Sequence, residues 1–160
     1  MFREVLGEFL GTAILLLLGN GVVAGVVLSK TKNNNAGWIV ITSGWGIAVA
    51  IAAFISGKLG PAHLNPAVTI AMAIKGDLGF ASVIPYIVAQ FAGAMLGTYL
   101  VYLMYKPHYE ATENPSDILG TFATGPALRD TTSNFISEML GTQHCPCKLS
   151  NYIKDNTCEP

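Results

Sequence analysis

The chemistry of this sequence centres on Asn65, which stands where a short apolar segment begins. A carboxamide has one acceptor oxygen and two N–H donors. Asn is a preferred N-cap residue, and Pro66 suits the first position of a helix that continues through Ala67. A helix over residues 66–74 would rise roughly 13 Å, under half the roughly 30 Å hydrocarbon thickness of a bilayer. The segment therefore predicts a re-entrant half-helix whose positive N-terminal end lies near the midplane of a membrane.

Asn65 could play either of two roles at this position. The carboxamide oxygen can cap the helix, which leaves the N–H donors to hold a water or a solute hydroxyl oxygen. Donors beside a positive helix end would also disfavour cations. The alternative is a plain N-cap that makes no solute contact.

The five residues before Asn65 are expected to be non-helical. Such backbone is tolerated at membrane depth only where protein or water satisfies it, so the carbonyl groups would form a row of acceptors for solute donors. These residues are Gly60, Pro61, Ala62, His63 and Leu64. A lone histidine near a helix start is more often packed than ligating, and we predict no metal at His63.

Glu8 is an acid inside an apolar run. Acids within a membrane are costly and usually face the interior of a helix bundle. Glu8 could carry a proton, or it could accept hydrogen bonds from backbone N–H groups of the loop around His63.

The composition is that of a membrane protein. The 160 residues are 51% hydrophobic and 12% charged, with a mean hydropathy of +0.47, whereas a soluble domain carries about 25% charged residues. Three stretches, near residues 5–28, 38–56 and 83–105, have the roughly 20 residues that a bilayer span requires. We predict an all-α, multi-pass protein of the cell membrane with three transmembrane helices and one half-helix. A net charge of −1 without a basic stripe gives no case for nucleic-acid binding.

A short internal sequence repeat indicates an inverted repeat. Residues 6–12 are LGEFLGT, and residues 136–142 are ISEMLGT. Glu138 takes the place of Glu8 in the second copy. Three predicted spans lie between the starts of the two copies, and an odd number of spans gives the second copy the opposite direction across the membrane. We therefore expect residues 1–142 to be the first half of an inverted-repeat transporter or channel, with a fourth helix starting near residue 134.

No apolar run comes after the second copy. Residues 143–160 are a polar tail that contains His144, Cys145, Cys147 and Cys158. The spacing Cys-Pro-Cys is not a standard zinc pair, so we predict no metal site there. Our hypothesis is that this tail is out-of-frame sequence.

Several segments, in order and spacing, resemble the major intrinsic protein family, which comprises the aquaporins and glycerol facilitators. The resemblance covers roughly residues 3–142, leaves 143–160 outside the family, and includes features of the glycerol-conducting branch. The segments that carry it are Glu8–Thr12, Trp45–Val49, Ser56–Gly57, His63–Thr69, Ala89–Ala94, and Phe122–Thr124 with Pro126.

The resemblance implies a fold and roles. The family fold has six spanning helices and two half-helices that meet at the midplane, of which this chain matches the N-terminal half. Subunits assemble as tetramers, each with its own pore. By resemblance, Asn65 and the carbonyls of residues 60–64 line the pore, and His63 anchors the loop. Glu8 and its symmetry mate Glu138 are structural acids. Trp45 matches an aromatic of the narrow filter; the alternative is an ordinary lipid-facing or core-facing tryptophan.

These features predict a channel for passive transport of glycerol, other small neutral solutes and water, with the lipid bilayer as its surroundings. The alternatives are a truncated, non-conducting remnant and a small membrane protein that associates with full-length relatives. We expect no enzyme and no cofactor, because the sequence has no nucleophile–base constellation and no phosphate-binding loop.

Overall fold

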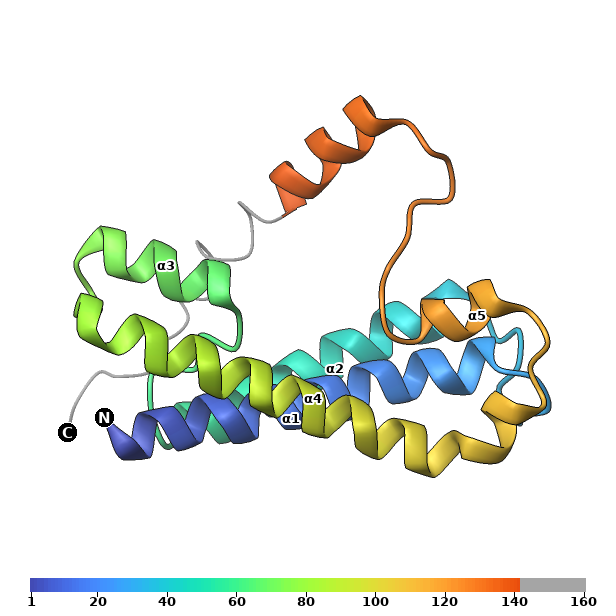
Figure 1. The fold of residues 1–160 in the computed structure, drawn as a ribbon, viewed down its shortest axis with the longest axis horizontal. Helices are drawn as coiled ribbons and strands as arrows, with labels where there is room; N and C mark the ends of the chain where they lie inside the picture. Colours follow the sequence, from blue (N-terminus) through green and yellow to red (C-terminus); the bar gives the residue numbers. More distant parts are fainter. Residues whose placement is uncertain (142–160) are drawn as a thin grey trace.

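Three long apolar helices form the body of the molecule. The computed structural model describes residues 1–141 of the chain. Helices α1 (Phe2–Val27), α2 (Trp38–Gly57) and α4 (Phe80–Glu110) lie side by side along the long axis (Figure 1). Each is long and apolar enough to cross a membrane. The predicted spans are confirmed, and α4 extends beyond the predicted 83–105 at both ends.

The half-helix is also present. Helix α3 (Pro66–Lys75) has ten residues and lies against the N-terminal part of α4 (Figure 1). It ends at Gly76, whose φ of 90° lies in the left-handed region that glycine adopts without a steric penalty. The segment is therefore too short to span a bilayer, as the sequence predicts.

Glycines let α1 and α4 approach closely. A Cβ atom on Gly93 would overlap the carbonyl oxygen of Phe9, and one on Gly97 would overlap that of Ala13. Small residues at a spacing of four allow such backbone contact between helices in lipid. Gly93 and Gly97 therefore let α4 pack directly against the backbone of α1.

The segment after α4 is more ordered than the sequence predicts. Polar residues with several prolines and glycines predict a loop over residues 106–133, but α4 continues to Glu110 and a short helix, α5 (Pro115–Gly120), comes next. Asn114 explains α5, because its side-chain oxygen accepts a hydrogen bond from Ser116 N and proline occupies the first helical position.

A further helix covers residues 131–141 and stands away from the bundle (Figure 1). It begins three residues before the predicted start near 134, because Asp130 accepts hydrogen bonds from Thr132 N and from the Ser133 hydroxyl. The tail at 143–160, with its cysteines, lies outside the described residues.

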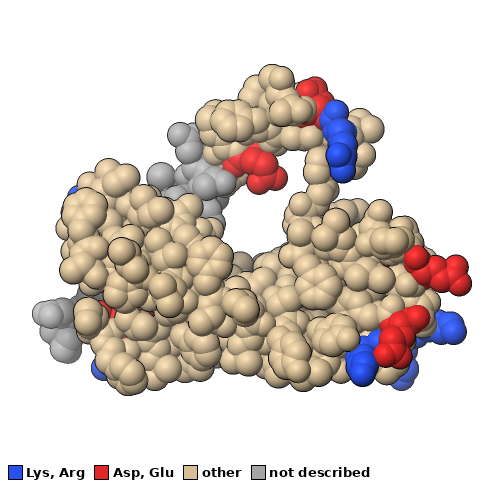
Figure 2. Space-filling model, viewed as in Figure 1, with Lys and Arg blue, Asp and Glu red and all other residues tan. Residues whose placement is uncertain are grey.

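Charged side chains are sparse on the visible face (Figure 2). Most lie around the end of the bundle near α5 and along residues 129–138, and a few are visible at the opposite end, while the sides of α2, α3 and α4 are uncharged there. Many large apolar side chains on these helices are exposed, among them Phe54, Ile74 and Met95. An apolar belt with charged ends fits a helix bundle embedded in lipid.

Candidate functional site

The site begins with the cap of α3. Asn65 has an extended backbone, with φ −154° and ψ 128°, and its Oδ1 accepts a hydrogen bond of 2.8 Å from Ala67 N. This is the predicted N-cap geometry. Asn65 is exposed, and within residues 1–141 no acceptor bonds its Nδ2. The amide is therefore oriented by its oxygen and presents both N–H donors outward.

The loop before Asn65 is non-helical, as predicted. Ala62 and Leu64 have positive φ values of 54° and 53°, a region that costs non-glycine residues roughly 1–2 kcal/mol each. In the described part of the chain no donor bonds the carbonyl oxygens of Gly60 through Leu64. The strained backbone leaves five successive acceptors unused by the protein.

Glu8 holds this loop in place. The fully buried carboxylate of Glu8 accepts hydrogen bonds from His63 N to Oε1 and from Leu64 N to Oε2, each 2.7 Å long. Only donors converge on it, which suits a carboxylate. Of the two roles that the sequence left open for Glu8, the structural acceptor is the one that this geometry matches.

Two residues in the same network were not singled out from the sequence. Gln90 of α4 donates from Nε2 to Glu8 Oε2 at 2.8 Å and to Thr69 Oγ1 at 2.9 Å. The Thr69 hydroxyl in turn donates to Asn65 O. Gln90 is almost fully buried. A polar side chain within an apolar run was the sequence signal that could have marked Gln90 as part of the site.

His63 is a packed residue. Its ring is buried, Nδ1 lies 3.3 Å from Thr69 Oγ1, and the ring sits against Tyr86 at a centroid distance of 5.7 Å. These contacts fix the side chain within the loop and match the predicted anchoring role.

The start of the loop packs against the beginning of α1. A Cβ on Gly60 would lie 2.9 Å from Glu4 Cα, so glycine is required for this approach. Arg3 also joins α1 to the residues before this loop, because its Nη2 donates a hydrogen bond of 2.6 Å to Lys58 O.

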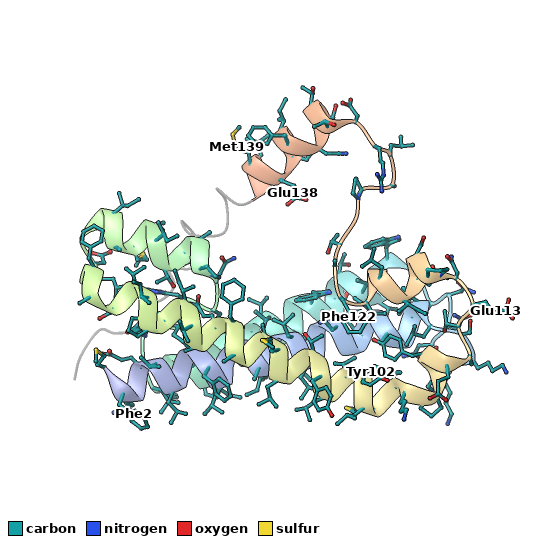
Figure 3. The ribbon with its side chains drawn as sticks, viewed as in Figure 1. Phe2, Tyr102, Glu113, Phe122, Glu138 and Met139 are labelled. Carbon is teal, nitrogen blue, oxygen red and sulfur yellow. The ribbon has the colours of Figure 1, made fainter. Side chains whose placement is uncertain are left out.

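The remaining predicted residues lie away from this network. Trp45 of α2 is half-buried, and its ring rests on Gly19 of α1. Glu138 is exposed on the helix at 131–141, and Figure 3 shows its side chain and that of Met139 leaving the helix on different sides. The predicted roles of Trp45 in a filter and of Glu138 as the mate of Glu8 stay predictions.

The arrangement supplies hydrogen bonds without a reactive group. A row of acceptors leads to two N–H donors at the positive end of a helix, which suits hydroxyl-bearing neutral molecules. Among residues 1–141 no group of three or more His, Cys, Asp or Glu side chains could hold a metal ion.

Spanning helices with a half-helix and a strained loop define a multi-pass membrane protein of the re-entrant-loop class. The family model described as "Major intrinsic protein" matches residues 1–158. The chain therefore belongs to the major intrinsic protein family, which confirms the resemblance inferred from the sequence.

The chain is similar to several named members of this family. The chain is 72% identical over 142 residues to a glycerol uptake facilitator protein of Streptococcus pneumoniae strain R6, covering 89% of this chain and 61% of that protein. It is 55% identical over 139 residues to glycerol uptake facilitator protein 3 of Lactiplantibacillus plantarum, covering 87% and 58%. The chain thus spans about three fifths of the length of these curated relatives.

A solved structure supports the fold. The aquaglyceroporin from Plasmodium falciparum superposes with a TM-score of 0.63 at 35% sequence identity, covering 69% of this chain and 44% of that one. With the three apolar helices, these findings confirm the predicted all-helical, multi-pass membrane protein.

Proposed function

We propose that this chain forms the first half of a channel that passes glycerol, other small neutral solutes and water down their gradients. Relatives named glycerol uptake facilitators support the choice of glycerol. The observation that carries the proposal is the loop at residues 60–65, whose carbonyl oxygens at 60–64 and Asn65 amide donors have no partner among the described residues. Glu8 meanwhile holds the backbone N–H groups of His63 and Leu64.

The order of these groups gives the mechanism. Glycerol hydroxyls would donate to the carbonyl oxygens of residues 60–64 and accept from the Asn65 amide. Because the loop is already fixed by the Glu8 carboxylate, a solute would replace its hydration shell without reordering the protein. The positive end of α3 and the donor-only amide would disfavour cations.

The channel also requires a second half-helix in the opposite orientation, as inverted-repeat proteins provide. In liposomes that contain this chain alone, a second copy inserted in the opposite direction would supply it. By resemblance to its family, the protein would assemble as a tetramer in which each subunit carries its own pore. Glu138 would begin the second repeat as Glu8 begins the first.

Stopped-flow light scattering on proteoliposomes tests the proposal. Liposomes that contain the full chain should swell in a glycerol gradient faster than empty liposomes, and their potassium leak should equal that of empty liposomes. Swelling at the empty-liposome rate would refute the channel and favour a non-conducting protein. Co-purification with a full-length relative would then favour the associating alternative.

A further inference from the structure

The Trp45 ring rests directly on the backbone of α1 at Gly19. A Cβ on Gly19 would lie 2.5 Å from Trp45 Cζ3 and 2.6 Å from Cε3 and Cη2. Real Cβ atoms essentially never come within 3.0 Å of another heavy atom, so any side chain at this position would displace the ring. The absence of a side chain at Gly19 therefore lets the Trp45 indole pack directly against the backbone of α1.

Neighbouring glycines do not share this property. Gly21, two residues further along α1, and Gly46, beside Trp45 on α2, have no atom within 4 Å of an added Cβ in the described part of the chain. Neither Gly21 nor Gly46 therefore has a ring packed against it as Gly19 has.

Contacts with both neighbouring helices hold α1 in place beside Gly19. Asn20, the residue after Gly19, is buried and donates from Nδ2 to Thr98 Oγ1 of α4 at 3.0 Å. One turn of α1 further on, Val22 meets Gly44 of α2, where an added Cβ would lie 2.8 Å from Val22. These contacts restrain α1 from shifting to make room, so the ring has to move instead.

We propose that Gly19 is a positioning residue for solute selectivity. It sets how far the Trp45 ring stands from α1, and thereby the width left for the carbon side of a polyol on the ring's other face. This inference rests on the proposed function and on the filter role that the family resemblance implies for Trp45.

The displacement can be sized from the contact distance. Ordinary van der Waals contact begins at 3.4 Å, so a methyl group at Gly19 would move the ring by about 0.9 Å. Glycerol fills more of a narrow passage than water does. The variant Gly19→Ala should therefore lower the ratio of glycerol to water permeability by about tenfold, equivalent to about 1.4 kcal/mol in the relative barrier.

The experiment compares Gly19→Ala with Gly21→Ala, the same substitution on the same helix in open space. Glycerol and water permeability are measured by stopped-flow light scattering. Trp45 fluorescence and its quenching by acrylamide are measured in a Trp38→Phe background, which leaves Trp45 as the one tryptophan; Trp38 is 72% exposed. We expect Gly19→Ala alone to lower the permeability ratio and to change the quenching.

Three outcomes would overturn the inference. They are unchanged quenching in Gly19→Ala, an equal change in Gly21→Ala, and changed quenching with an unaltered permeability ratio. The double variant Gly19→Ala/Trp45→Phe should show the ratio of Trp45→Phe alone, because the smaller ring clears the added methyl group. A further fall in that ratio would place the effect of Gly19 elsewhere.

Failure of the proposed function is recognised separately. If the unmodified chain does not conduct, the channel proposal fails, and the quenching comparison alone decides whether Gly19 positions the Trp45 ring.

Discussion

Replacing Glu8 by glutamine should release the loop before α3. The substitution keeps the shape of the side chain but replaces one acceptor oxygen with an NH2 donor. Three N–H groups converge on the carboxylate, from His63 N, Leu64 N and Gln90 Nε2, at 2.7–2.8 Å. Hydrogen bonds to a charged group contribute about 1.5–3 kcal/mol, and a buried donor left without an acceptor costs about 1–3 kcal/mol. We expect the loop to lose about 2–4 kcal/mol of stability.

Amide hydrogen exchange in detergent micelles measures this loss at the bonds concerned. A tenfold change corresponds to about 1.4 kcal/mol, so exchange at His63 and Leu64 should quicken by about 30-fold to 1,000-fold. Glu4→Gln is the matched control one turn earlier on α1. The Glu4 side chain is 42% exposed and bonds the N-terminus and Tyr86 rather than the loop. Unchanged exchange in Glu8→Gln, or equal acceleration in Glu4→Gln, would refute the reasoning.

Three further predictions concern packing and capping. Gly93→Ala should destabilise the fold by about 1–3 kcal/mol, because the methyl group overlaps a carbonyl of α1. The measurement is thermal unfolding in micelles, and the control is Gly46→Ala, where the added methyl group meets no atom. A double-mutant cycle on Asn20→Ala and Thr98→Ala should give a coupling of about 0.6–1.7 kcal/mol from their hydrogen bond. Hydrogen bonds from the Ser133 hydroxyl and from backbone N–H groups lower the pKa of Asp130. The Asp130 carboxylate should therefore stabilise the helix at 131–141 fully above pH 3.8, and this stabilisation should be lost as the pH falls below 3.8. Circular dichroism measures the loss of helix.

Each of these predictions has a contrary result. Equal unfolding midpoints for Gly93→Ala and Gly46→Ala would show that α1 and α4 do not approach as described. A coupling energy near zero would show that the hydrogen bond between Asn20 and Thr98 does not stabilise the bundle. An acid transition that persists in Asp130→Ala would assign it to another group.

The helices could be predicted because their signals are local. Apolar runs of about 20 residues set the three spans, and Asn65-Pro66 with Gly76 sets both ends of α3. The segment after α4 was harder, because α5 depends on a cap at Asn114 and on packing rather than on periodicity. The ring of Phe122 stacks on Tyr109, and the Tyr109 hydroxyl bonds Thr121; no pattern in the sequence indicates these contacts.

The site was predicted where one residue determines its own geometry. The cap by Asn65 results from its residue type and position. The bonds of Glu8 to the loop could only be offered as one of two roles, because they join residues 55 and 56 positions apart. The hydrogen bonds of Gln90 and the contact of Gly19 with the Trp45 ring depend on how the helices cross, and the sequence alone does not give this arrangement.

Glycerol flux through the variant Asn65→Asp tests most directly whether the Asn65 donors serve the solute. The aspartate keeps an oxygen to cap α3 but removes both N–H donors. Asn114→Asp makes the same change at the cap of α5, away from the loop. We predict that proteoliposomes with Asn65→Asp lose at least about tenfold in glycerol permeability, the effect of about 1.4 kcal/mol, while Asn114→Asp conducts as the unmodified chain does. Equal glycerol permeability in the two variants would contradict a solute-binding role for Asn65.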